Sequence, residues 1–163
     1  MTGTSDAGGR PVFRGRLLTV LLRSTPEGSR EVVVHPGAVG MVVVDGYGRL
    51  LLVRQHREGA GKPLWEIPAG TLEPEERPLA VAKRELLEET GLSARQWRFL
   101  GLIYPTPGYS TERIFLFLAQ GVEGTPVARA EVAEVRFFSP QEVRRLARTG
   151  QGDGKTLAVL ALL

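Results

Sequence analysis

The sequence has 163 residues, of which 42% are hydrophobic and 24% are charged. This composition is typical of one globular domain, because a chain of this length buries roughly 70% of the surface that it exposes when unfolded. The chain has no cysteine and two histidines, which excludes thiolate zinc sites, disulfide frameworks, a cysteine nucleophile and histidine-rich metal centres. The lack of cysteine also favours a cytoplasmic location.

The formal net charge of +3 is unevenly distributed along the chain. Seven acidic residues and three basic residues lie between Glu66 and Glu89, so this stretch carries −4 and the remainder carries +7. A basic balance favours an anionic ligand such as a phosphate ester. The acidic stretch within a basic chain calls for a separate explanation.

The first part of the chain divides into two segments. We expect residues 1–12 to form a flexible N-terminus, because the stretch up to Arg10 is small and polar and lacks the apolar run of a signal peptide. Residues 13–36 are predicted to form an arm of strands, with the first ordered element near Arg16 and strands over residues 17–22 and 31–35. This pair of strands suits either a subunit contact or the core.

Residues 37–163 are predicted to form the main domain, of the α/β class with a mixed β-sheet covered by helices. Strands are expected over residues 38–44 and 50–55, joined by a hairpin at residues 45–48, and later over 97–104, 114–119 and 132–138. Gly59, Gly61 and Pro63 interrupt the strand pattern. Helices are expected over 78–90, from a capping box at Ser139 to Gly150, and over 156–163; the last is too short to span a membrane.

The helix over residues 78–90 carries the chemistry. On a helical wheel Leu79, Ala82 and Leu86 form a core-facing stripe, and Glu85, Glu88 and Glu89 converge beside it. These like charges repel one another and lie at the helix end that disfavours anions. A divalent cation would turn that repulsion into coordination, and oxygen ligands without sulfur or imidazole select hard ions such as Mg²⁺ or Mn²⁺.

The alternative interpretation is that a glutamate-rich helix is simply a solvated face. The surrounding residues argue against it: Arg84 precedes Glu88 by four positions and can brace it, and Glu76 enters the same neighbourhood from a glycine-bearing loop. The relevant positions are Gly70, Glu76, Arg84, Glu85, Leu86, Glu88, Glu89, Gly91 and Leu92.

This string matches the Nudix box without exception, so the chain resembles a Nudix hydrolase. The resemblance implies the Nudix-type α/β/α sandwich over nearly the whole chain, and hydrolysis of a nucleoside diphosphate linked to another group, with Mg²⁺ or Mn²⁺ and more than one ion per site. It also implies that Glu85 and Glu89 are metal ligands, with Glu88 and the Ala69 carbonyl as further ligands. By the same resemblance, Arg84 and Glu76 orient the other groups of the site, and Gly70 and Gly91 have a structural role in the box.

Features outside the box resemble the ADP-ribose pyrophosphatase branch of the family. They are the segment 65–70, which leads into the box and contains Glu66, the basic end of a strand at residues 53–57, Pro107 fifteen residues after the box, and the loop 107–112. The resemblance makes Glu112 the candidate general base, which would take a proton from the attacking water. It also implies a homodimer formed through the N-terminal arm. In two places the chain departs from the branch, with Thr111 for an acid and Glu75 for a glycine.

Four residues are candidates for binding substrate. Arg54 and Arg57 are placed to hold phosphate oxygens, although arginines at a strand end are as often solubilising. Glu66 lies in the approach to the box, and Tyr109, in a loop, can stack on a purine. For ADP-ribose the products would be AMP and ribose 5-phosphate.

Other functions are less well supported. Residues 150–156 superficially resemble a phosphate-binding P-loop, but the first glycine is out of place and the segment follows a helix, which favours a flexible connection. Within the family the alternatives are a nucleotide sugar or a capped RNA end, although no basic cluster with interleaved aromatic residues indicates a nucleic-acid groove. Outside enzymes, the alternative is a non-catalytic ADP-ribose sensor.

Overall fold

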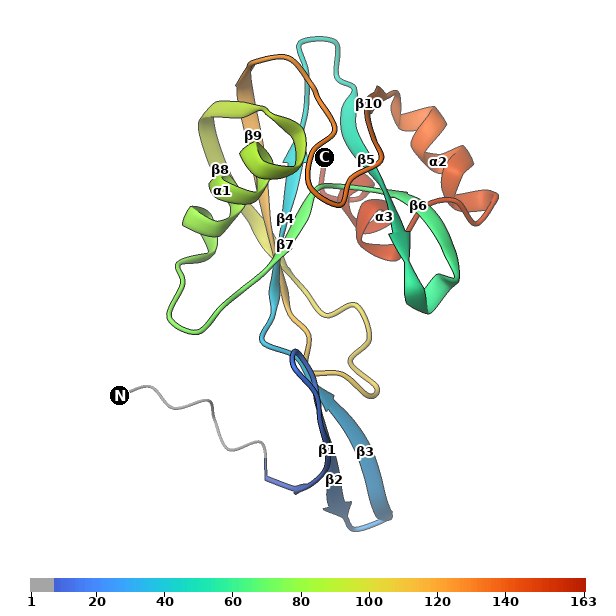
Figure 1. The fold of residues 1–163 in the computed structure, drawn as a ribbon. Coiled ribbons are helices and arrows are strands. Elements are labelled where there is room, and N and C mark those ends of the chain that lie inside the picture. Colours follow the sequence, from blue (N-terminus) through green and yellow to red (C-terminus); the bar gives the residue numbers. More distant parts are fainter. Residues whose placement is uncertain (1–7) are drawn as a thin grey trace.

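The computed structural model describes residues 8–163 and shows a two-sided α/β body with an arm of strands standing out from it (Figure 1). The strands are β1 (Arg10–Arg14), β2 (Thr19–Thr25), β3 (Gly28–Val34), β4 (Ala38–Val43), β5 (Leu50–Arg57), β6 (Lys62–Glu66), β7 (Ala69–Thr71), β8 (Ser93–Ile103), β9 (Ile114–Glu123) and β10 (Glu134–Phe138). The helices are a short 3₁₀ turn (Glu58–Ala60), α1 (Pro78–Thr90), α2 (Pro140–Arg148) and α3 (Gly154–Leu160). No helix within residues 8–163 is long and apolar enough to cross a membrane.

The body contains two sheets. One has the order β7-β4-β9-β8, in which β4 runs parallel to β9 and antiparallel to β7, and the other has the order β10-β5-β6. The turn predicted at residues 45–48 is present, and the side chain of Asp45 accepts hydrogen bonds from the backbone N–H groups of Tyr47 and Arg49, each at 2.9 Å. The predicted hairpin is wrong, because β4 and β5 belong to different sheets and only an isolated bridge between Val44 and Leu50 pairs the chain across the turn. The parallel pair makes the architecture mixed, as predicted.

Alternate residues of the central strands supply two cores. In β4, Val42 belongs to the core that includes Val143 of α2 and Val159 of α3. Its neighbours Met41 and Val43 belong to the core that includes Leu86 of α1. Because successive strand residues point to opposite faces, α1 covers one face and α2 and α3 cover the other (Figure 1). The α/β/α sandwich predicted from the family resemblance is therefore confirmed.

The N-terminal arm is a three-stranded antiparallel sheet with the order β1-β2-β3. The expectation that ordered structure starts near Arg16 is wrong: β1 begins at Arg10 and pairs with β2, so it lies across the predicted boundary between residues 12 and 13. The part of the predicted flexible N-terminus before residue 8 lies outside the described residues. β2 and β3 form the predicted strand pair.

Helix α1 has the predicted bounds, from Pro78 to Thr90, with Gly91 in the left-handed conformation at a φ of 71°. The predicted core stripe needs one correction, because Leu79 is 37% exposed and Val81 is buried beside Ala82 and Leu86. The buried face is thus rotated toward Val81 in the first turns. Further along, the same buried side includes Glu89.

Two strands lie where the sequence indicated interruption or loop. β6 contains Pro63, which is tolerated because β6 is the edge strand of its sheet. β7 is only three residues long and pairs with β4. It places Ala69 and Gly70 directly beside α1, and so positions the start of the box and the loop that follows it.

Candidate active site

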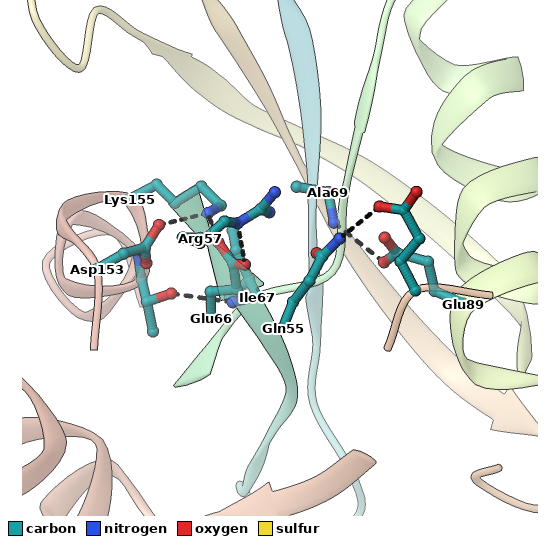
Figure 2. A network of polar contacts seen from close by, with 10 residues as sticks. Gln55, Arg57, Glu66, Ile67, Ala69, Glu89, Asp153 and Lys155 are labelled. Atoms are coloured by element: carbon teal, nitrogen blue, oxygen red, sulfur yellow. Dashed lines mark hydrogen bonds and ion pairs between the residues drawn. The ribbon is translucent and has the colours of Figure 1, made fainter. Parts of the chain in front are cut away.

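The three carboxylates predicted as metal ligands lie at the C-terminal half of α1 but differ in burial. Glu89 is 8% exposed, Glu85 is half-buried, and Glu88 is exposed. The backbone N–H of Ala69 donates a hydrogen bond to Oε2 of Glu89 at 3.3 Å, which ties β7 to the helix (Figure 2).

The two more buried carboxylates have pKa values above the ordinary range. Burial, followed by the nearby charge of Glu85, raises the pKa of Glu89 to about 7, and the hydrogen bond from Ala69 only partly opposes this. The pKa of Glu85 is also raised, mainly by burial, against the opposing charge of Arg84. Both side chains therefore lie where an added positive charge would favour the ionised forms.

Arg84 is the cation that holds this group of carboxylates together. Its Nη1 atom lies 2.8 Å from Oε1 of Glu85 and 3.1 Å from Oε2 of Glu88, and its Nη2 atom lies 3.4 Å from Oε1 of Glu76. Glu76 also accepts a hydrogen bond of 2.9 Å from the backbone N–H of Glu73. Arg84 and Glu76 thus link the box loop to the helix, in keeping with the orienting roles that the resemblance implies.

Gly70 is the point of closest approach between the loop and α1. A Cβ atom at this position would lie 2.2 Å from Cγ of Glu85 and 2.5 Å from its Cδ. Glycine is therefore required for the Glu85 side chain to lie against β7.

Two adjoining cavities, of about 810 Å³ and about 450 Å³, flank this loop. Both are lined by Leu17, Arg57 and residues 69–71. The larger cavity is also lined by Arg84 and the three carboxylates of α1, and the smaller one by Glu112 and Lys155. The two cavities therefore share β7 and Arg57 as walls, with the predicted metal ligands lining one cavity and the predicted general base lining the other.

Arg57 and Glu66, both predicted to bind substrate, are in contact. Glu66 is 1% exposed, and its Oε1 atom accepts a hydrogen bond of 2.6 Å from Nε of Arg57. Its other oxygen, Oε2, accepts from Nζ of Lys155, which also contacts Asp153 (Figure 2). Buried charges in proteins are normally paired in this way.

Glu112 lies in a loop that is hydrogen-bonded to β3 of the N-terminal arm. The backbone N–H of Val33 donates to the carbonyl of Tyr109 at 2.7 Å, and Thr111 donates back to the carbonyl of Val33 at 2.9 Å. The hydroxyl of Thr111 accepts from the N–H of His35 at 3.0 Å. Thr111 thus holds the loop that presents Glu112.

The other two predicted substrate residues lie away from both cavities. Arg54 forms an ion pair with Glu134 of β10, on the face of β5 opposite to Arg57, because residues three apart in a strand point to different faces. Tyr109 is 58% exposed and is not among the residues that line either cavity. The structure therefore groups Arg57 and Glu66 but not Arg54 or Tyr109.

Three residues of the cavity walls, Gln55, Glu131 and Lys155, are not among the predicted site residues. Gln55 is buried and donates from Nε2 to Oε2 of Glu131 at 3.3 Å, and both side chains line the larger cavity with the carboxylates of α1. Figure 2 shows Gln55 beside Glu89. The period of two in β5 indicates that Gln55 shares the face of Arg57. Lys155 lies in the segment 150–156 that is predicted to be a flexible connection, and Glu131 lies far along the chain from the box, where no local pattern points to it.

Comparison with known proteins identifies the family. Residues 34–160 match the NUDIX domain. The chain belongs to the Nudix family. It is 35% identical to an ADP-ribose pyrophosphatase of Bacillus subtilis over 81% of this chain and 74% of the relative. It is 43% identical to an ADP-ribose pyrophosphatase of Mycobacterium tuberculosis, where the match covers 66% of this chain and about half, 53%, of the relative.

A solved structure has the same Nudix fold. It is described as an ADP compounds hydrolase and superimposes with a TM-score of 0.74 over 96% of this chain and 89% of that chain, at 21% sequence identity. At this identity the likeness concerns the fold. The predicted Nudix box therefore lies in a Nudix domain, on the strand, loop and helix described above.

Proposed function

We propose that the protein hydrolyses the diphosphate bridge of ADP-ribose to give AMP and ribose 5-phosphate. Two relatives named ADP-ribose pyrophosphatase support the substrate. The observation that carries the chemistry is the placement of an intact set of box carboxylates and of Arg57 on the walls of two adjoining cavities. The larger cavity has the carboxylates of α1 on one part of its wall and Arg57 on another. Carboxylates that hold a metal ion and an arginine that binds phosphate oxygens together suit a diphosphate.

The donor set fits a hard divalent cation, Mg²⁺ or Mn²⁺. We propose that Glu85, Glu88, Glu89 and the carbonyl of Ala69 hold it, with room for more than one ion in the larger cavity. Oxygen donors without sulfur or imidazole select such ions, and burial together with the charge of Glu85 raises the pKa of Glu89, so a bound cation would favour its ionised form. Within residues 8–163 no three acidic or imidazole side chains are gathered into a preformed ligand cluster, but Glu85, Glu88 and Glu89 all line the larger cavity.

When bound, such an ion polarises phosphoryl oxygens and lowers the pKa of coordinated water. The chain's own residues do the rest. Arg57 binds non-bridging phosphate oxygens, Glu66 fixes the direction of Arg57, and Arg84 keeps Glu85 and Glu88 on the cavity side. Arg54 and Tyr109 are left out of this assignment because they lie away from the cavities.

Glu112 is proposed to accept the proton of the attacking water. The oxygen of that water forms a bond to phosphorus while a bond from phosphorus to the bridging oxygen breaks, and the leaving phosphate carries away the electron pair. Glu112 is half-buried and lines the smaller cavity beside Arg57. General bases of this kind contribute roughly 10²- to 10⁴-fold in rate.

A substrate panel tests the proposal. ADP-ribose, nucleotide sugars, diadenosine polyphosphates and capped RNA are incubated with the purified protein and Mg²⁺, and the products are separated by chromatography. We expect ADP-ribose to have the highest kcat/KM. Preference for another compound would overturn the substrate, and binding of ADP-ribose without hydrolysis of any compound would identify a sensor.

Two substitutions test the assigned residues. Glu89→Gln should abolish Mg²⁺-dependent turnover, and Glu112→Gln should lower kcat by at least about 10²-fold while leaving the stabilisation by Mg²⁺ unchanged. If Glu112→Gln keeps kcat within a few fold of wild type, Glu112 is not the base. Full activity of Glu89→Gln would show that the metal site lies elsewhere.

We also propose that the arm formed by β1, β2 and β3, which is the predicted segment 13–36 extended back to Arg10, dimerises the protein, and that the Nudix domain follows from residue 37. The arm stands out from the body (Figure 1), and Val12, Phe13 and Leu17 are 49%, 59% and 52% exposed. Exposed apolar side chains on a projecting sheet favour a protein partner, here a second copy. Sedimentation equilibrium should give twice the monomer mass, and Phe13→Asp should give a monomer. A cytoplasmic location remains a prediction.

A further inference from the structure

The segment predicted to be a flexible connection, residues 150–156, is docked along β6. The backbone N–H of Trp65 donates to the carbonyl of Gln151 at 2.8 Å, and that of Ile67 donates to Oγ1 of Thr156 at 2.9 Å. Thr156 is 2% exposed. The residues on both sides of Glu66, Trp65 and Ile67, are therefore hydrogen-bonded to this segment. These bonds place the first turn of α3 next to the Glu66 carboxylate.

Glu66 has two cationic partners on two different oxygens. Nε of Arg57 donates to Oε1, and Nζ of Lys155 donates to Oε2 (Figure 2). Lys155 is in turn held by Asp153, whose other oxygen caps α3 by accepting from the N–H of Thr156 at 3.0 Å. The Lys155 side chain is 11% exposed and the Arg57 side chain is 40% exposed.

The single hydrogen bond from Nε is unusual for an arginine beside a carboxylate. Arginine and carboxylate often form two parallel hydrogen bonds, which engage a terminal amino group as well. Here Lys155 donates to Oε2 of Glu66, so Arg57 donates only to Oε1, through Nε. The Arg57 side chain also lines both cavities.

We propose that Lys155 is a positioning residue: by holding Oε2 of Glu66, it keeps the terminal amino groups of Arg57 available to phosphate oxygens in the cavities. This inference rests on the proposed function, since it assigns Arg57 to the diphosphate. Lys155 acts through Glu66 and Arg57 rather than by touching the reacting atoms.

The choice of lysine agrees with this role. The chain has 18 arginines and only three lysines, Lys62, Lys83 and Lys155. Lys62 and Lys83 are exposed, whereas Lys155 is enclosed between Glu66 and Asp153. An ammonium is a compact point charge that can satisfy two carboxylates in a small space, whereas a guanidinium needs partners for a planar fork of five donors.

The test combines kinetics with a double-mutant cycle. Lys155→Met keeps most of the aliphatic stem and removes the charge, and it should raise the KM for ADP-ribose about tenfold while kcat changes less than about threefold. In an Arg57→Met background the same substitution should cause no further rise in KM, because Lys155 acts through Arg57. Lys62→Met, at the exposed start of β6, is the matched control and should leave both constants unchanged.

An unchanged KM in Lys155→Met, or an equal rise with and without Arg57, would overturn the proposal. Crystal structures of wild type and Lys155→Met give a readout that does not depend on the substrate. We expect Arg57 to form two hydrogen bonds with Glu66 in the variant, and a retained single Nε contact would overturn the inference. Failure of the proposed function would show instead as a wild-type protein that does not hydrolyse ADP-ribose.

Discussion

Gly70 and Glu85 touch so closely that no side chain fits between them: a Cβ atom on Gly70 would lie 2.2 Å from Cγ of Glu85. The first glycine of the Nudix box is thus a packing requirement of a carboxylate fifteen residues later. Steric exclusion therefore explains why this chain has glycine at position 70.

Gly70→Ala should displace the Glu85 side chain from β7 and lower kcat/KM by about 10²-fold, because a misplacement of about 1 Å in a catalytic group has an effect of that size. Steady-state kinetics with ADP-ribose and a Mg²⁺ titration would measure it. Gly46→Ala is the control, since a Cβ atom there meets nothing within 4 Å. Wild-type kinetics for Gly70→Ala would show that Glu85 tolerates the displacement.

Glu75→Gly should stabilise the protein. Glu75 has a φ of 69°, a left-handed conformation that costs a non-glycine residue about 1 kcal/mol or more. We expect the free energy of unfolding to rise by about 0.5–1 kcal/mol in urea denaturation, after the entropy of glycine in the unfolded chain is deducted. Glu75→Ala removes the charge but keeps the strain, so an equal gain for alanine would attribute the effect to charge.

The metal-free protein should lose stability as the pH rises from about 4.5 to 7. The folded pKa of Glu89, about 7, lies above its ordinary value of 4.5, so in this range the folded state keeps a proton that the unfolded state releases. Folding is therefore favoured at the acidic end. In EDTA the Tm of wild type should fall more steeply between pH 5.5 and 7.5 than that of Glu89→Gln.

The control for this pH experiment is Glu123→Gln, because the Glu123 side chain is 57% exposed and pairs with Arg95, a residue type that is not deprotonated in proteins, so the slope should be unchanged. Added Mg²⁺ should raise the Tm more at pH 7.5 than at pH 5.5, since protons compete with the ion for the same carboxylates. Equal slopes for wild type and Glu89→Gln would assign the pH dependence to another group.

Thr111→Val should loosen the loop that presents Glu112. The variant removes the hydroxyl that accepts from the N–H of His35, which should cost about 1 kcal/mol of stability and lower kcat about tenfold with a smaller change in KM. Thr25→Val is the matched control, because its hydroxyl is bonded at the exposed β2–β3 turn. A parallel loss of kcat in both variants would indicate a general effect of destabilisation.

The parts of the fold that local chemistry determines could be predicted. Helix α1 follows from Pro78 at its start and Gly91 at its end, and α2 follows from the capping box of Ser139 and Glu142, which is present in full. Strand β6 could not be predicted in this way, because Pro63 opposes a central strand and only tertiary pairing shows that β6 lies at an edge.

The residues of the site also divide into those that local spacing predicts and those that only long-range contacts place. The converging carboxylates of α1 follow from helical spacing, and the likeness of the box adds Ala69 and Gly70. Lys155 contacts Glu66 across 89 positions, and a contact of that separation leaves no periodic pattern in the sequence. For Arg54, the basic strand end suggested a substrate contact, but the period of two in β5 turns its side chain toward Glu134.

Strand β4 has a further consequence for the motions of the molecule. All six of its residues are buried and paired with β9, and Ala38, Val39 and Gly40 are also paired with β7. Its amide hydrogens can therefore exchange with solvent deuterium only when the body as a whole unfolds. The exchange rates of β4 thus report global stability from within the native protein, and the faster exchange expected of β1, all five of whose residues are exposed, measures how independently the arm opens.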